Sequence, residues 1–192
     1  MSNKFAVSSE PIIPVLEKRW SPRAFDKNHT LTKDDLTPAL EAARWAPSAG
    51  NSQPSRFVVS FRDTKGFAEI LDNLNSANAH WAKNASALIV NIAEVHDDEG
   101  RNRRWAEYDL GQAVAHFSVQ AHADGLFVHQ MGGFDGPGIE LALGLPEARR
   151  VVTVMAVGML ADPETVDLAD HHMKQELAPR SRIDLNDVKT FV

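Results

Sequence analysis

The run Val151-Val152-Thr153-Val154-Met155-Ala156-Val157 is the clearest strand signal in the chain. It is continuous, apolar and rich in β-branched residues, which favours a fully buried strand. A second run, Ala87-Leu88-Ile89-Val90-Asn91-Ile92, has the same character and is too short and too β-branched for a helix. These two runs predict the buried strands around which the rest of the fold is arranged.

The segments around these strands alternate between strand and helix patterns. Further strands are expected at 57–61 and 126–130, and helices at 32–46, 67–74, about 103–123 and 136–144. In the first helix, Pro38 lacks a backbone donor, so the helix either bends there or begins late, with Thr37 as its cap. Residues 162–192 are polar and weakly periodic, which predicts a C-terminal arm with little core of its own. Strands interleaved with helices predict an α/β or α+β sandwich, a sheet covered by helices.

Composition limits the class of protein. The 192 residues carry a net charge of −6, are 43% hydrophobic, and contain no repeat or linker, which predicts a single globular domain over residues 1–192. An acidic chain lacks the basic surface that nucleic acid requires, and no apolar stretch is long enough for a membrane span or a signal peptide. With no cysteine, disulfides, thiolate nucleophiles and iron–sulfur clusters are excluded, and we expect a cytoplasmic protein.

Several familiar motifs are absent. The chain has no Walker loop, no strand-linked G-x-G-x-x-G, no G-x-S-x-G and no H-E-x-x-H. His116 and His122 lie six residues apart, which is not the spacing that places two ligands on one helical face, and His171-His172 falls in the polar arm. No metal site is therefore predicted.

Three segments carry polar groups suited to a ligand. Arg19-Trp20-Ser21-Pro22-Arg23 places two guanidinium groups beside a hydroxyl, donors that suit a phosphate, although two solvated arginines are the alternative. The loop 46–54, with Asn51 and Gln53, has small side chains that let a flat ligand approach the backbone, or it simply connects a helix to a strand. In 129–135, the pair Gly132-Gly133 frees backbone N–H groups for a ligand or makes a turn.

In this order and spacing, the three segments resemble the nitroreductase family of FMN-dependent oxidoreductases. The resemblance covers roughly residues 11–192 and extends to other family patterns: Asp109-Leu110-Gly111-Gln112-Ala113, Leu143-Gly144-Leu145-Pro146, the strand ending at Gly158, and Pro179-Arg180-Ser181-Arg182. The chain departs from the family at Ser55, where an aromatic residue is common after Gln-Pro, and this leaves the substrate preference open.

The resemblance implies an α+β three-layer sandwich with a mainly antiparallel, mixed sheet, and a homodimer that exchanges its C-terminal arms. FMN would bind at the interface, with Arg19, Ser21 and Arg23 and the arm's arginines at its phosphate and pyrimidine ends and the 47–53 loop of the other subunit on its opposite side. The implied cofactor-binding residues are Arg19, Trp20, Ser21, Arg23, Pro47, Ser48, Asn51, Gln53, Asn78, Met131, Gly132, Gly133, Arg180 and Arg182.

The family's activity is implied as well. NADH or NADPH would reduce FMN and leave, and a planar acceptor such as a nitroaromatic or quinone would take its place, in a ping-pong cycle that needs no catalytic side chain. The backbone N–H groups at Gly132-Gly133 would favour the anionic reduced flavin. Asp109 and Gly111 are assigned structural roles, since a helix interior needs glycine only where another backbone packs closely. The alternative is a protein that stores or sequesters flavin without turnover.

Overall fold

Strands β2 and β4, which contain the two apolar runs, are the inner strands of a four-stranded sheet. The computed structural model describes residues 4–192, and the strand order is β1-β2-β4-β3. The strands are β1 (Ser55–Phe61), β2 (Ala87–Glu94), β3 (Phe127–Met131) and β4 (Arg149–Gly158). All three pairings are antiparallel. Inner strands are covered on both faces, which is why both runs are continuously apolar.

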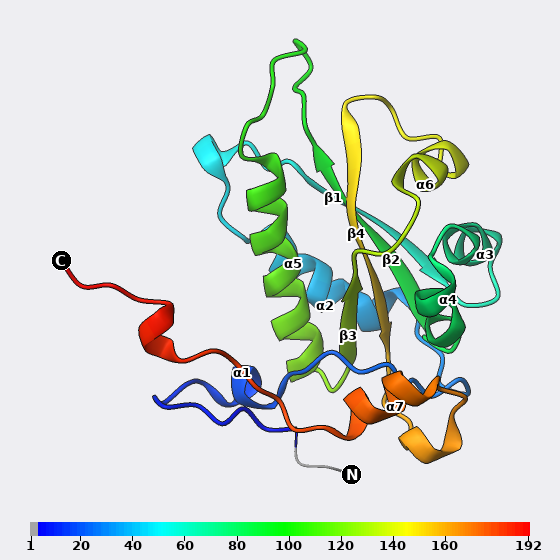
Figure 1. Cartoon of the computed structure of the whole chain (residues 1–192). Coiled ribbons are helices and arrows are strands. Elements are labelled where there is room, and N and C mark those ends of the chain that lie inside the picture. Colours follow the sequence, from blue (N-terminus) through cyan, green and yellow to red (C-terminus); the bar gives the residue numbers. More distant parts are fainter. Residues whose placement is uncertain (1–3) are drawn as a thin grey trace.

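Helices cover both faces of this sheet and complete a three-layer sandwich (Figure 1). One face packs against α2 (Lys33–Arg44) and α5 (Ala106–Ala123), and the other against α3 (Lys65–Asp72), α4 (Ser76–Ala82) and α6 (Gly136–Ala142). Alternation along β2 builds both cores, because Ile89 points to the first face and Leu88 to the second. The predicted α+β sandwich with a mainly antiparallel sheet is confirmed.

The helix predicted over 32–46 is confirmed with its early start, whereas the helix predicted from about 103 begins later. α2 begins directly after Thr32, whose N–H donates to the Asp35 carboxylate at 2.7 Å, and it continues through Pro38. The late start at Thr37 is therefore wrong, because this capping box secures the early start. α5 begins at Ala106 rather than near Arg103, since the Arg103 N–H donates to the Val95 carbonyl at 2.8 Å and is tied to the end of β2.

The C-terminal segment contains more structure than predicted. Helix α7 (Asp170–Leu177), which was not predicted, packs onto the body with His172 and Glu176 buried. Only residues 178–192, called the arm below, extend away from the layers (Figure 1). The short helix α1 (Pro14–Lys18) lies near the base of the arm and was not predicted, because five residues are too few for a periodic pattern.

Within residues 4–192, none of the helices has the length and apolar character needed to cross a membrane.

Candidate functional site

The first motif, residues 19–23, follows α1 and has no regular secondary structure. Arg19 ends that helix with extended backbone angles, φ −64° and ψ 132°. The His129 ring nitrogen Nδ1 lies 2.9 Å from the carbonyl of Pro22 and ties the segment to β3. The segment is therefore fixed against the sheet.

The arm brings two further arginines to this segment. Nη1 of Arg180 donates to the carbonyl of Glu17 at 2.7 Å and to that of Lys4 at 3.2 Å. Lys4 in turn donates through Nζ to the carbonyls of Gln175, at 2.9 Å, and Ala178. These bonds join the start of the chain, α1 and the base of the arm.

Arg19, Arg180 and Arg182, here called the arginine group, lie close enough to repel one another. Burial lowers the pKa of Arg19 and of Arg180, and the nearby positive charge of Arg182 lowers both further. Among residues 4–192, no carboxylate forms an ion pair with any member of the group. In a chain with more acidic than basic residues, three neighbouring arginines without an acidic partner favour an anion site.

Arg23 has different surroundings from the arginine group. Its backbone N–H donates to Oε1 of the buried Glu176, and its guanidinium carbon lies 5.9 Å from the centre of the Trp81 ring. Its Nε is buried and has no hydrogen-bond partner in the described part of the chain. Burial lowers the pKa of Arg23, and the charge of Glu176 opposes that shift. Arg23 therefore holds an unused donor in a partly apolar setting, where the acceptor atoms of a flat ligand would satisfy it.

The second motif forms a loop with an unusual backbone. Gly50, Asn51 and Gln53 all have left-handed backbone angles, with φ of 59°, 55° and 46°. Only glycine adopts this region freely, so two other residues in it indicate a shape that the rest of the structure imposes. The hydroxyl of Ser48 accepts the N–H of Gln53 at 3.0 Å and closes the loop. The side chains of Asn51 and Gln53 remain exposed.

Asp109 holds this loop in place. The side chain is 3% exposed, and its carboxylate accepts the Ala49 N–H at 3.1 Å. This is a structural role, as expected from the sequence. The expectation for Gly111 is wrong within one chain, because an added Cβ would have no atom within 4 Å in the described residues, and the position is exposed.

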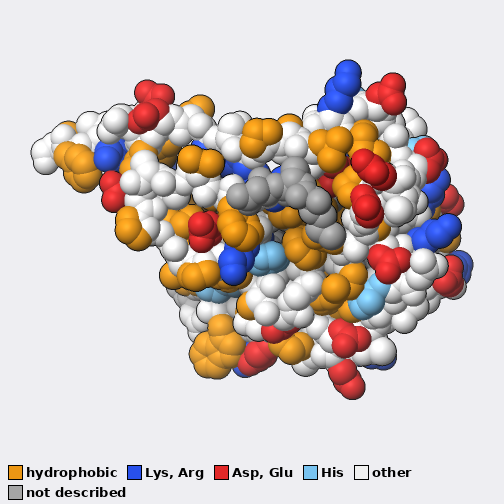
Figure 2. Space-filling view, turned by 90° about the horizontal axis from the view of Figure 1, so that it is seen from below, with side chains coloured by type: hydrophobic (Ala, Val, Ile, Leu, Met, Phe, Trp, Pro, Cys, Tyr) orange, Lys and Arg blue, Asp and Glu red, His pale blue; other side chains and the backbone are white. Residues whose placement is uncertain are grey.

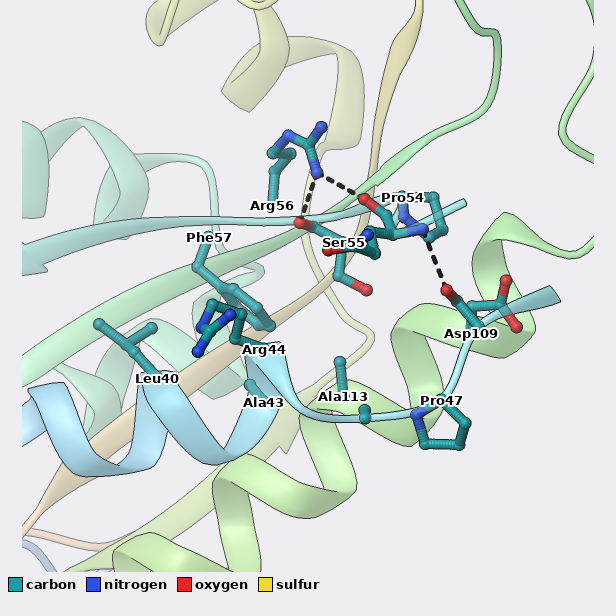
Figure 3. A pocket seen from close by; sticks show the side chains of 13 residues that line it. Leu40, Ala43, Arg44, Pro47, Pro54, Ser55, Arg56, Phe57, Asp109 and Ala113 are labelled. Atoms are coloured by element: carbon teal, nitrogen blue, oxygen red, sulfur yellow. Dashed lines mark hydrogen bonds between the residues drawn. The ribbon is translucent and has the colours of Figure 1, made fainter. Parts of the chain in front are cut away.

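Beneath the loop lies a cavity of about 320 Å³ between α2, α5 and the start of β1 (Figure 3). Ser55, the position at which the sequence departs from the family, lines this cavity. Arg56 donates to the carbonyls of Gln53 at 2.8 Å and Ser55 at 2.9 Å, as the dashed lines in Figure 3 show. The loop is thus tied at one end to α5 and at the other to β1.

The third motif follows β3. The carbonyl of Gly133 accepts the N–H of Asn75 at 3.0 Å and Nδ2 of Asn78 at 3.1 Å, which joins this turn to α4. Gly132 is exposed, whereas the side chain of Met131 is 2% exposed and belongs to the core. Only the backbone of Met131 is therefore placed to reach a ligand. Asn78 and the glycine pair, which are far apart in sequence, meet as a single feature.

One chain does not bring the three motifs together. The loop contacts α5 at Asp109, whereas the charges of Arg19 and Arg180 act on His122 near the other end of that helix. Thirteen helical residues separate these two contacts, which corresponds to about 20 Å. On the side of the arginine group, Arg23 lies beside the Trp81 ring of α4. Asn78 of the same helix bonds Gly133, so the glycine pair lies on this side too. The 46–54 loop is therefore the part of the candidate site that lies apart from the other two motifs.

Sequence reasoning missed two residues that shape this site, Glu176 and Trp81. Glu176 anchors the backbone of Arg23, and Trp81 packs against both Arg23 and His129, whose ring centre lies 4.6 Å away. Neither carries a local motif, because each acts through a contact between distant segments. A glutamate in an otherwise polar helix gives no sign in the sequence that it is buried.

Comparison with known proteins places this geometry in context. Residues 16–89 match the model of the nitroreductase family. A 15.4 kDa protein of Mycolicibacterium smegmatis, whose function is uncharacterised, is 35% identical over 143 residues, which cover 69% of this chain and 92% of that protein. The major NAD(P)H-flavin oxidoreductase of Aliivibrio fischeri is 39% identical over 84 residues, which cover 43% of this chain and 38% of that one.

Solved structures agree with these relationships. The crystal structure of an oxidoreductase containing FMN superposes with a TM-score of 0.89 at 35% identity, over 99% of this chain and 96% of that one. A nitroreductase family protein of Clostridium novyi gives a TM-score of 0.67 at 25% identity, over 86% and 90% of the two chains. The structural similarity thus extends over the whole fold, including the arm.

Proposed function

This chain belongs to the nitroreductase family, and on that premise we propose that it is an FMN-dependent oxidoreductase that uses NADH or NADPH to reduce nitroaromatic or quinone-like acceptors. The observation that carries the proposal is the arginine group. The group is positively charged and has no acidic partner in the described residues, and burial lowers the pKa of Arg19 and Arg180, a setting that suits a phosphate.

The residues present fit FMN. The arginine group would hold the phosphate, with Ser21 as a further donor. The unused Nε of Arg23 would meet the acceptor atoms of the pyrimidine ring, and the exposed backbone at Gly132 would lie near the isoalloxazine. Bound FMN would supply the redox chemistry, since it accepts a hydride from one substrate and passes it to the next.

The site would be completed in a homodimer. The loop that should face the flavin lies about 20 Å along α5 from the arginine group, so the loop of a second copy would supply that wall. The arm supports this arrangement, because it exposes large apolar side chains that nothing in the described chain covers: Ile183, Val188 and Phe191 are 69%, 66% and 88% exposed. Figure 2 shows hydrophobic side chains, coloured orange, on the part of the molecule that projects to the left.

Such a site would serve two substrates in turn. The loop and Ser55 would bound one flat slot over the flavin, so NAD(P)H would have to leave before a planar acceptor enters. The chain's own residues would bind, orient and exclude water, and no side chain would need to move a proton. The lack of cysteine fits a reducing compartment, and we place the protein in the cytoplasm.

A visible absorption spectrum and steady-state kinetics test this function. Purified protein should show two flavin bands, and double-reciprocal plots against NAD(P)H at several quinone levels should be parallel. A flavin store would show the bands but no acceptor-dependent turnover. A colourless protein that takes up no added FMN would rule out the flavin assignment, and intersecting lines would rule out the shared slot.

A further inference from the structure

A second cavity, larger than the one beneath the loop, lies beside the 19–23 segment. Its volume is about 640 Å³, within the range of sites for small organic molecules. Trp20 is one of its walls, whereas Arg19, Ser21 and Arg23 are not among its lining residues. The cavity adjoins the proposed FMN site without sharing these three residues, because His122 in its lining lies within reach of the charges of Arg19 and Arg180.

Its walls are mainly apolar and partly aromatic. Trp20, Phe127 and Leu160 line it together with Pro163 and Leu177. Lys4 lies over the Trp20 ring at 4.7 Å from the ring centre, and its ammonium is already bonded to two backbone carbonyls. Such walls favour a flat apolar molecule.

The charged side chains that line the cavity balance one another, and Arg19 and Arg180 act on His122 from outside the lining. Lys4 and Lys18 contribute two positive charges, and Asp162 and Glu164 two negative ones. Burial raises the pKa of Glu176, the third acidic residue, and so favours its neutral form. A neutral occupant is therefore favoured over a strongly charged one.

Two polar atoms of the lining have no partner in the described part of the chain: Nδ1 of His122 and Oε2 of Glu176. Glu176 is 2% exposed, and its other carboxyl oxygen accepts the N–H of Arg23. Burial lowers the pKa of His122 and so favours the neutral ring, in which one nitrogen is an acceptor. Buried polar atoms are rarely left unsatisfied, so Nδ1 of His122 calls for a donor group on a ligand, and the neutral carboxyl of Glu176 calls for an acceptor through Oε2.

We propose that this cavity binds a neutral, planar aromatic compound bearing a hydroxyl or amino group, which donates to Nδ1 of His122. Its ring would lie among Trp20, Phe127 and Leu160, and Glu176 would contact a second polar group where one is present. A compound with acceptors alone, such as a quinone, would leave Nδ1 unpaired, whereas the corresponding hydroxyaromatic would not. The occupant sits beside the segment that carries Arg19 and Arg23.

Calorimetric titration of the FMN-loaded enzyme with 2-naphthol and with 2-methoxynaphthalene tests the proposal. The two probes share the ring system, but only the first has a donor. We expect saturable binding of 2-naphthol, about tenfold weaker binding of the methoxy compound, and no displacement of 2-naphthol by NADH. No saturable binding, equal affinities, or displacement by NADH would each overturn the proposal, the last because it would place the probe in the flavin slot.

His122→Phe provides the matched variant, since it keeps a ring beside Phe127, whose ring centre lies 4.9 Å away. It should weaken 2-naphthol about tenfold and abolish the difference between the probes. His116→Phe, at an exposed position of the same helix, should change neither. Thermal unfolding and the flavin spectrum check that both variants fold. Equal effects of the two substitutions would contradict the assignment of His122.

Discussion

The two ends of α5 hold the two halves of the proposed flavin site by different means. At the N-terminal end, the loop is held through its backbone, by Asp109 at 3.1 Å from the Ala49 nitrogen and by Ser48. At the C-terminal end, Arg19, Arg180 and Arg182 are kept together in spite of their like charges. There the force that opposes repulsion is the anchoring of the arm, through Arg180 on Glu17.

The two ends of α5 therefore suit different parts of the proposed ligand. A rigid, uncharged backbone shape suits the flat ring of a flavin, whereas concentrated positive charge suits a phosphate. Both ends belong to one proposed ligand, yet about 20 Å of helix separates them in each chain. A twofold axis between two copies would bring the loop end of α5 in one copy close to the arginine-group end of α5 in the other.

The largest expected effect separates the two halves genetically. Ser48→Trp should block the loop half, and Arg19→Ala combined with Arg182→Ala should remove the charge of the other half. Each homodimer should lose FMN and activity, whereas a heterodimer purified through two different tags should regain about half of the wild-type FMN content, because one of its two sites is intact. An empty heterodimer would mean that both halves act within one chain.

Acid should lower the stability of the half of the site at the C-terminal end of α5, and His129 should be a cause. Burial lowers its pKa to about 4 from 6.5. Between these pH values the unfolded chain binds a proton that the folded chain does not, so the free energy of unfolding falls as the pH falls through this window. The full shift corresponds to about 3 kcal/mol.

Urea unfolding at pH 7 and near pH 4 measures this effect. His129→Gln should lose less stability over the interval than the wild type, by up to about 3 kcal/mol. Identical losses would show that His129 does not contribute to acid sensitivity.

Removal of a phosphate-facing charge should discriminate between two flavins. Arg182→Ala should weaken FMN about ten- to a hundredfold, at about 1.5–3 kcal/mol per charge-assisted bond, and leave riboflavin nearly unchanged. Arg23→Ala should weaken both flavins alike, since Arg23 lies with Trp81 and apart from the arginine group. Equilibrium dialysis measures both, with Arg150→Ala, an exposed residue paired with Glu107, as the control. Equal losses of both flavins in Arg182→Ala would contradict a phosphate contact.

At the other end of α5, Asp109→Ala should release the loop. It removes a buried acceptor and should cost about 1–3 kcal/mol of stability, with a loss of FMN affinity of about tenfold. Asp109→Asn keeps an oxygen for the Ala49 N–H and should retain much of both. Glu107→Ala, exposed on the same helix, is the control. If Asp109→Ala destabilises the protein but leaves FMN affinity intact, the loop does not face the flavin.

The smallest effect concerns the surface between the two ends. Gly111 is exposed and has free space around it within one chain. Gly111→Ala should therefore stabilise an isolated chain by about 0.5–1 kcal/mol through the helix backbone. If α5 packs closely against a second copy, the added methyl group should instead raise the dimer dissociation constant, which sedimentation at several concentrations measures. An unchanged dimer would place the subunit contact elsewhere.

The sequence predicted the elements whose signals are local. The apolar runs in β2 and β4 and the C-terminal end of α5 at Ala123 are determined by neighbouring residues, and they appear as expected. The start of α5 was misplaced, because Arg103 bonds the end of β2 rather than its own helix. α7 was missed as a packed element, because its buried residues, His172 and Glu176, are polar.

The candidate site shows the same limit. The residue types in the three motifs, and the family resemblance that they support, were readable because phosphates and flat rings require arginines, glycines and amides near one another in sequence. Their grouping was implied only by the family resemblance, and the individual contacts were not predicted. Asn78 meets Gly133, and Arg23 meets Glu176, through contacts between segments more than 50 residues apart.

The sequence by itself determined the strands, most helices and the residue types of each motif, because periodicity, backbone preference and side-chain donors are properties of short segments. Only the tertiary structure decided that the loop and the arginine group lie near opposite ends of α5, and that Trp20 lines a second cavity in which atoms of His122 and Glu176 have no partner among the described residues. The physical reason is that these relations depend on how the layers pack. A local pattern determines which groups are available, and packing determines which of them meet.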